Sequence, residues 1–228
     1  VADANTLSFG DASSDSAFSI SAWIRPDDVD RFRAVTKSND TQTEYILGTN
    51  SSDKAAIHVY DNDTGNNIGM PSLTSISTNV WTHIVGTYSG GGSGGLNIYV
   101  NGVNDNGTQA STGSYTAMHN TSGTLDIGRW QDTDTYADGE IRDVKIYDYE
   151  LSSDQVSSLY SGSYNVTPLH WWKINNGDNV AVDDNGVIQS SAESFAIEDA
   201  GTGTDADATN EPAGSRANWV NGTLDLDG

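Results

Sequence analysis

The sequence of 228 residues contains no cysteine. Disulfide bonds and cysteine-bound zinc or iron–sulfur sites are therefore excluded, and the fold must rest on packing, hydrogen bonds and, where a site exists, a hard cation bound by oxygen atoms. A chain of this length can bury a core without covalent cross-links. We expect one large domain or two small ones.

Basic residues are few: ten Lys and Arg stand against 32 Asp and Glu, which gives a formal net charge of -22. Binding to the phosphates of nucleic acid requires clustered Lys and Arg, so neither nucleic acid nor an anionic membrane is expected as a partner. An acidic surface attracts Ca²⁺ and suits a salty medium, where ions screen its self-repulsion.

Long apolar runs are also missing, and no segment approaches the roughly 20 residues that span a bilayer. The first ten residues, VADANTLSFG, have neither the basic start nor the apolar stretch of a signal peptide. We expect a chain that does not enter a membrane.

What the sequence does contain is a series of short β-rich runs separated by Gly, Asn, Asp and Ser, the pattern of an all-β sandwich. In the first run, apolar residues alternate with Ser19, Ser21 and Trp23. Trp23 and Trp81 are interpreted as core residues because both lie inside strands. The predicted strands are 17–26, 43–49, 56–62, 80–89, 96–103, 124–130 and 140–151.

One short helix is predicted after these strands. Ser152 and Gln155 have the spacing of a capping box, and Leu151 and Val156 fit a hydrophobic staple. The helix should end near Tyr160, before a Ser-Gly pair.

Four blocks between Leu7 and Tyr160 resemble the laminin G-like, concanavalin A-like lectin/glucanase family, in the order the family has them. The blocks are LSFGDASSDSAFSISAWIRPDD, VWTHIVGTYSGGGSGGLNIYVNGV, GTLDIGRW and DGEIRDVKIYDYELSSDQVSSLY. The resemblance implies a two-sheet antiparallel jelly-roll sandwich with one short helix. Similar blocks occur in virion proteins of marine phages and in secreted adhesins.

The remainder of the chain suggests a permuted order. Residues 1–164 look like the body of such a domain, whereas 165–228 contain LHWWKINNGDNVAVDD and ANWVNGTLDLDG, which resemble its first strands. The tail would complete its own body, donate strands to a neighbouring copy head to tail, or begin a next repeat; a plain linker is the alternative. The strand LDLDG is expected beside VKIY, and Trp171 and Trp172 should place one indole on each face of a strand, one in the core and the other against a neighbouring module.

Catalysis is not expected. A glycoside hydrolase needs two carboxylates that flank the scissile bond. The nearest candidates, Glu140 and Asp143, are spaced to lie on opposite faces of a strand, and the four histidines have no metal or triad spacing. A glycan-active enzyme of the same superfamily remains the alternative.

Calcium is the expected cofactor. Asp143 resembles the position from which the superfamily's structural calcium takes a carboxylate, and the permuted order makes Asp227 its partner. Otherwise Asp143 is a solvated strand residue.

A glycan is the expected ligand. Trp130 ends a strand and is followed by Asp132, Asp134 and Tyr136. An aromatic ring that stacks on a sugar, with carboxylates that bind its hydroxyl groups, is a common form of glycan site. The alternative is an aromatic side chain that caps the core. Together these features predict a structural or adhesion module of a virion or extracellular surface, in contact with glycans and with further copies of itself.

Overall fold

The computed structural model describes most of the chain up to residue 174 and short strands beyond it. The described ranges are 1–39, 41–61, 65–92, 94–131, 135–163, 166–172 and 174, with strand residues 181–182, 188–189, 196–197, 206–207, 216–220 and 223–227.

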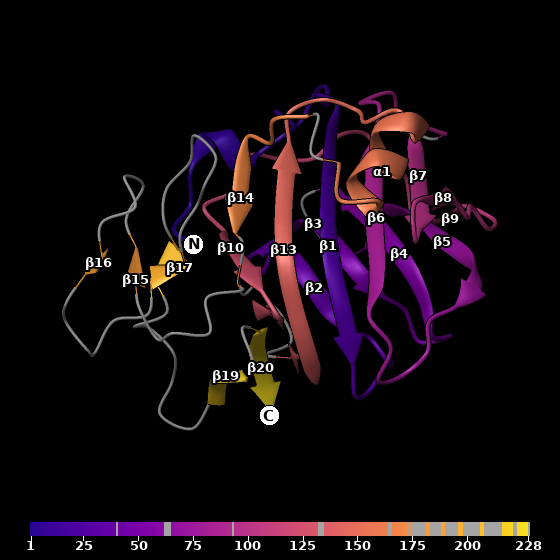
Figure 1. Cartoon of the computed structure of the whole chain (residues 1–228). Helices are drawn as coiled ribbons and strands as arrows, with labels where there is room; N and C mark the ends of the chain where they lie inside the picture. Colours follow the sequence, from indigo (N-terminus) through magenta and orange to yellow (C-terminus); the bar gives the residue numbers. More distant parts are fainter. Residues whose placement is uncertain are drawn as a thin grey trace.

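Two antiparallel sheets face each other, as the sequence predicts (Figure 1). The larger sheet has the order β19-β20-β13-β1-β6-β7-β8, and β14 also pairs with β13. Its strands are β19 (Arg216–Val220), β20 (Thr223–Asp227), β13 (Gly139–Tyr147), β14 (His170–Trp172), β1 (Phe18–Pro26), β6 (Thr82–Tyr88), β7 (Leu96–Val100) and β8 (Val103–Asn104).

The second sheet has six strands in the order β10-β2-β3-β4-β5-β9. They are β10 (Thr124–Ile127), β2 (Arg33–Ser38), β3 (Thr43–Thr49), β4 (Lys54–Tyr60), β5 (Asn67–Ser75) and β9 (Ala110–Thr112). The sequence analysis missed β2 and β5. Two-stranded pairs are β11 (Arg129–Trp130) with β12 (Thr135–Tyr136), β15 (Ala181–Val182) with β16 (Ile188–Gln189), and β17 (Ala196–Ile197) with β18 (Ala206–Asp207); η1 (Asn5–Leu7) is a short 3-10 turn.

The core lies between the two sheets and follows from the alternation within the strands. Every second residue of β1, from Phe18 to Ile24, is fully buried, and Tyr45 and Leu47 face them from β3. The sheets approach so closely that a Cβ atom on Gly86 of β6 would lie 2.5 Å from Cδ1 of Ile57 on β4. A side chain at position 86 would therefore push the sheets apart.

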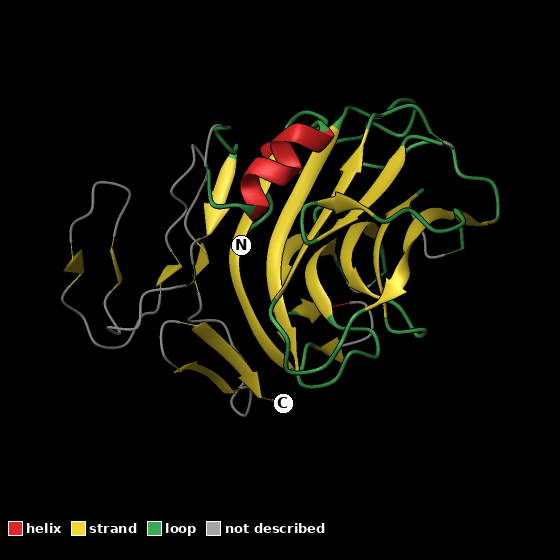
Figure 2. Cartoon of the chain, turned by 45° about the vertical axis from the view of Figure 1, so that its right-hand side comes forward, coloured by secondary structure: helices red, strands yellow, loops and turns green. Residues whose placement is uncertain are grey.

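The helix α1 (Ser153–Tyr160) begins with the predicted capping box: Ser152 accepts from the Gln155 backbone, and Gln155 accepts from the Ser152 backbone. Figure 2 shows it lying across the outer face of the larger sheet. There Val156 and Leu159 pack in a buried cluster with Val85 of β6. No helix in the described part of the chain has the length and apolarity to cross a membrane.

Trp23 and Trp81 are half-buried on the outer face of the larger sheet, so their assignment to the core was wrong. The Arg142 guanidinium lies between them, 5.2 Å from one ring and 4.2 Å from the other. The reason is the alternation in β1, which directs Ile24 inward and Trp23 outward.

The tail strands pair with β13 of the same chain. Val144 and Ile146 pair with β14, whereas β20 pairs with Glu140 and Ile141. LDLDG therefore lies beside the first half of β13, and HWW, not LDLDG, lies beside VKIY. Trp172 is fully buried in the core, and the indole of Trp171 lies on the other side. One indole on each face is thus confirmed, whereas the division after residue 164 stays a prediction.

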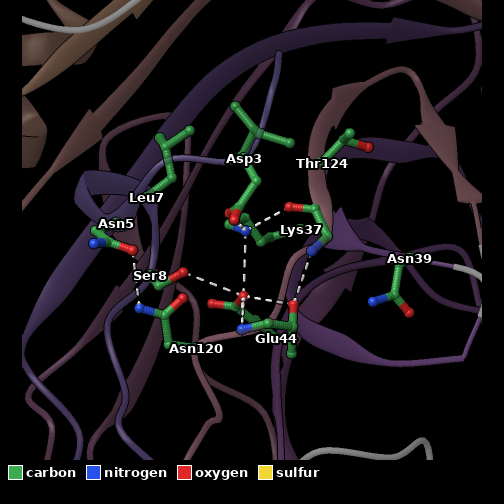
Figure 3. A network of polar contacts seen from close by, with 12 residues as sticks. Asp3, Asn5, Leu7, Ser8, Lys37, Asn39, Glu44, Asn120 and Thr124 are labelled. Carbon is green, nitrogen blue, oxygen red and sulfur yellow. Dashed lines mark hydrogen bonds and ion pairs between the residues drawn. The ribbon is translucent and has the colours of Figure 1, made fainter.

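A buried ion pair lies at one end of the smaller sheet (Figure 3). The Nζ of Lys37, on β2, is 3.2 Å from Oε1 of Glu44, on β3, and both side chains are fully buried. Asp3 of the N-terminal segment lies 2.7 Å from the same Nζ, which also donates to the Gly123 carbonyl. The pair therefore connects two central strands with the N-terminal segment and the loop before β10.

Glu44 has hydrogen bonds beyond its cation. Its Oε1 accepts from the backbone and hydroxyl of Thr121, at 3.0 and 2.8 Å, and from the hydroxyl of Ser8. Burial raises the pKa of Glu44, and the charge of Lys37 opposes that change. Without Lys37 the ionised carboxylate would be buried with no counter-ion.

His83 is buried beneath aromatic rings on the outer face of the larger sheet. Its Nε2 is 2.9 Å from the hydroxyl of Ser21, and its ring lies 5.1 Å from Trp23 and 6.0 Å from Tyr160. Burial lowers the pKa of His83 to about 4, so the ring is neutral at pH 7.

We expect Lys37→Met to lower the free energy of unfolding by about 3–5 kcal/mol at pH 7, because it leaves Glu44 charged and unpaired in the interior. Burial raises the pKa of Glu44, so the loss should shrink as the pH falls and the carboxylate takes up a proton. The double variant with Glu44→Leu should recover much of the loss. Urea unfolding at pH 7 and pH 4.5 checks this, and an equal loss at both pH values would contradict the role of the Glu44 charge.

Acid should weaken the fold through His83. Since its folded pKa of about 4 lies below the ordinary 6.5, its stabilising contribution is complete above pH 6.5 and is lost as the pH falls toward 4. The loss is about 3 kcal/mol at most. His83→Gln cannot titrate, so the stability difference between wild type and variant should narrow from pH 7 to pH 4. A constant difference would show that His83 does not titrate in this range.

Candidate functional site

The outer face of the six-stranded sheet carries a row of residues that are paired in register. Thr36, Ile46, His58 and Gly69 lie opposite one another across β2, β3, β4 and β5. The next row, which includes Leu47 and Ile57, belongs to the core. Because successive side chains of a strand point to opposite faces, the first row faces outward.

A small hairpin, β11–β12, adds aromatic residues to this face. Arg129 pairs with Tyr136, and Trp130 pairs with Thr135. The hairpin is attached to β2 by a hydrogen bond of 2.6 Å from the Thr36 hydroxyl to the Arg129 carbonyl. Trp130 and Tyr136 are therefore held at the border of the outward row.

The indole of Trp130 is fixed from two directions. Its Nε1 donates to the hydroxyl of Thr43 on β3 at 3.3 Å. The guanidinium of Arg33 on β2 lies 4.8 Å from the ring centroid. The ring is half-buried, which leaves part of it available to a ligand.

Arg33 is 8% exposed. Its Nη1 donates to the Thr49 carbonyl at 3.1 Å, and its Nε has no hydrogen-bond partner among the described residues. Burial is the main cause that lowers the pKa of Arg33, although a guanidinium remains charged at any pH at which the protein folds.

His58 lies flat over a position that has no side chain. A Cβ atom on Gly69 would be 2.3 Å from its Nδ1, so glycine makes room for the imidazole. The ring stacks on Tyr60 with centroids 6.1 Å apart. Burial, with a smaller contribution from the Arg33 charge, lowers the pKa of His58 to about 4. At neutral pH the imidazole is uncharged.

Carboxylates are scarce on the described strands of the smaller sheet. Glu44 and Asp126 are the two that these strands contain. Glu44 is buried with Lys37, whereas Asp126 pairs with Thr36 and accepts a hydrogen bond from the Thr124 hydroxyl. These strands therefore offer no pair of carboxylates for glycoside hydrolysis.

Glu140 and Asp143, on the other sheet, are engaged by basic residues. Glu140 forms an ion pair with Arg25, and Asp143 forms one with Lys145. Two carboxylates that are each paired with a cation are poorly suited to act as acid and base on one substrate.

Asp143 does not fit a calcium site in this arrangement. It lies at a β-bulge with φ of 57°, and its carboxylate accepts from the Trp171 indole besides pairing with Lys145. Since Asp225 pairs with Glu140, Asp227 lies opposite position 138, roughly 16 Å along the strand from Asp143. The described residues contain no group of three or more His, Asp or Glu that could hold a metal ion. Calcium binding stays a prediction that these contacts do not support.

Of the predicted glycan residues, the structure brings Trp130 and Tyr136 to the same hairpin beside the six-stranded sheet. Asp132 and Asp134 lie outside the described residues. Sequence reasoning missed Arg33 and His58. Each is a polar residue among β-branched and aromatic neighbours. Such a residue indicates a side chain on the outer face of a sheet, and this was the signal available in the sequence.

Comparisons with known proteins agree with this architecture. The sequence profile of the concanavalin A-like lectin/glucanases superfamily matches residues 2–157. No curated protein matches the sequence.

Three solved structures are among those to which the chain is similar. The CBM40 domain of Ruminococcus gnavus IT-sialidase, bound to α2,3-sialyllactose, has a TM-score of 0.50 and 10% identity over 65% of this chain and 84% of that chain. The binding domain of botulinum neurotoxin serotype G has a TM-score of 0.50 and 17% identity over 72% of this chain and 40% of that chain. The heptameric SAP-like pentraxin from Limulus polyphemus has a TM-score of 0.45 and 19% identity over 70% of this chain and 79% of that chain.

Sequence identities as low as 10% carry information about the fold alone. The family profile is stronger evidence, because it matches about two thirds of the sequence. Together with the two facing antiparallel sheets, this match shows that the chain belongs to the concanavalin A-like lectin/glucanases superfamily.

Proposed function

We propose that this chain is a non-catalytic carbohydrate-binding module that binds glycan at the border of its six-stranded sheet, beside Trp130 and Tyr136. The observation that carries the proposal is the fixed position of Trp130, whose indole is held by Thr43 and Arg33 and remains half-buried. A pre-positioned aromatic ring loses little conformational entropy when a sugar stacks on it.

The surroundings of the indole suit a sugar. Tyr136 and Arg129 belong to the same hairpin, with the guanidinium 5.6 Å from the phenol ring centroid. Aromatic faces contact the C–H groups of a sugar, while nearby polar groups bind its hydroxyls. Asp132 and Asp134 continue the same hairpin in sequence and are proposed as further ligands of those hydroxyls.

A glycoside hydrolase is the rival function within the same superfamily. The carboxylates on the described strands argue against it, because Glu44 is buried beside Lys37 and Glu140 is paired with Arg25. We therefore propose binding without turnover, on the surface of a virion or in an extracellular array.

Self-association is the second part of this proposal. The edge of β13 is covered by β14 and β20, which come from the tail of the chain. The tail of a neighbouring copy would make the same backbone hydrogen bonds, because strand addition depends on the exposed edge more than on which molecule supplies the strand. A head-to-tail exchange of this kind builds rings or filaments.

Trp130→Ala should weaken the binding of the best glycan by about 2 kcal/mol, which raises Kd roughly thirtyfold, because the substitution removes the stacked ring. Binding is measured by titration calorimetry with the strongest glycan from an array. Trp81→Ala, the same change on the opposite sheet, is the matched control and should leave Kd unchanged. Equal affinity of wild type and Trp130→Ala would refute this site, and release of reducing ends by the wild type would favour the hydrolase.

A chain that ends at residue 164 should lack β14, expose the edge of β13 and leave the core uncovered where Trp172 packs. Light scattering tests the assembly proposal: the full chain should form oligomers that grow with concentration. The truncated chain should not polymerise but should bind an added 165–228 fragment. A full chain that stays monomeric at high concentration, with its tail resistant to protease, would establish closure within one molecule.

A further inference from the structure

The outer face of the six-stranded sheet contains a buried charge, that of Arg33, for which the described residues supply no ion-pair partner. Among the residues that the structure describes, no carboxylate lies within ion-pair distance of Arg33, although the side chain is only 8% exposed. Asp126 is not the counter-ion of Arg33, since it pairs with Thr36, which is three residues farther along β2 than Arg33. In a chain with 32 acidic residues and ten basic ones, a buried arginine without a carboxylate is unexpected.

An uncompensated buried cation lowers stability, because it has lost water without gaining a counter-ion. Among the described residues, the guanidinium has a hydrogen bond to the Thr49 carbonyl, and its buried Nε has no partner there. By contrast, Lys37, which is also buried, has two carboxylates within ion-pair distance. Of these two buried cations, Lys37 has carboxylate partners and Arg33 has none among the described residues.

The position of Arg33 connects it with the proposed sugar site. Its guanidinium lies against the indole of Trp130, 4.8 Å from the ring centroid. A sugar that stacks on this ring would have its substituents near the guanidinium, whose planar fork matches the two oxygens of a carboxylate or sulfate. His58 is neutral on the same face, whereas Arg33 carries a positive charge beside the ring of Trp130.

We propose that this face selects glycans that carry an acidic group, and that Arg33 receives the carboxylate or sulfate of the sugar that stacks on Trp130. The inference rests on the proposed glycan-binding function and adds to it the chemical class of the ligand. The anion of the ligand would supply the counter-ion that the described part of the chain does not provide.

The test uses the full chain and an array of matched oligosaccharides in neutral, carboxylated and sulfated forms. The wild type should bind acidic members at least tenfold more tightly than their neutral partners, and the preference should decrease with added salt because the contact is electrostatic. Arg33→Gln should abolish the preference while the weaker binding of neutral glycans persists. Arg31→Gln is the matched control, since it removes the same charge two residues away, from an exposed side chain paired with Asp30.

The outcomes separate this inference from the function on which it rests. Equal, Trp130-dependent binding of neutral and acidic glycans by the wild type would overturn the acidic preference and leave the binding function intact. Absence of all glycan binding would overturn both. An acidic preference that survives in Arg33→Gln would overturn the role of Arg33. If Arg33→Gln does not fold, Arg33→Lys serves instead, because lysine keeps the charge but lacks the planar fork of the guanidinium. An unchanged preference of Arg33→Lys for carboxylated glycans would contradict bidentate recognition.

Discussion

The ion pair of Lys37 and Glu44 is the interaction on which the candidate site depends. Between Lys37, which pairs with Tyr45, and Ser38, which pairs with Thr43, the register of β2 and β3 shifts by one residue. That extra residue is Glu44, which turns inward to Lys37, while the hydroxyl of Thr43 receives the indole N–H of Trp130. A slip of register would leave two buried charges unpaired, so the pair specifies the register that positions the aromatic ring.

The two outer faces of the sandwich are used differently. On the larger sheet, the helix α1 covers Val85, and Trp23, Arg142 and Trp81 stack on one another. On the smaller sheet, the outer face includes a buried arginine and a neutral histidine. The first face is occupied by the protein's own side chains. On the second, the described residues supply no carboxylate for Arg33, which is the reason for placing the ligand there.

Membership of the superfamily does not by itself distinguish a lectin from a glucanase, because function resides in the site and not in the fold. In this chain the distinction rests on where carboxylates and cations lie. The charges of Glu44, Glu140 and Asp143 are each matched by a lysine or arginine, whereas no acid among the described residues forms an ion pair with Arg33. Paired carboxylates stabilise a fold, and an unpaired guanidinium suits recognition of an anion.

The sequence by itself determined the class of fold. Alternation in the segment 17–26, the Ser152–Gln155 capping box and the four family blocks predicted the strands, the helix and the jelly roll, because these signals are local. Trp130 and Tyr136 were identified by their place at the end of a strand, and the outward direction of Trp23 was also present in the alternation although it was assigned to the core.

Only the tertiary structure decided the rest. The structure places HWW, and not LDLDG, beside VKIY, and it places the guanidinium of Arg33 against the indole of Trp130. Both are contacts between residues far apart in the sequence. The ion pair of Asp143 with Lys145 was also visible only in the structure. Strand register and the burial of a charge depend on which segments the folded chain brings together, and no local pattern encodes them.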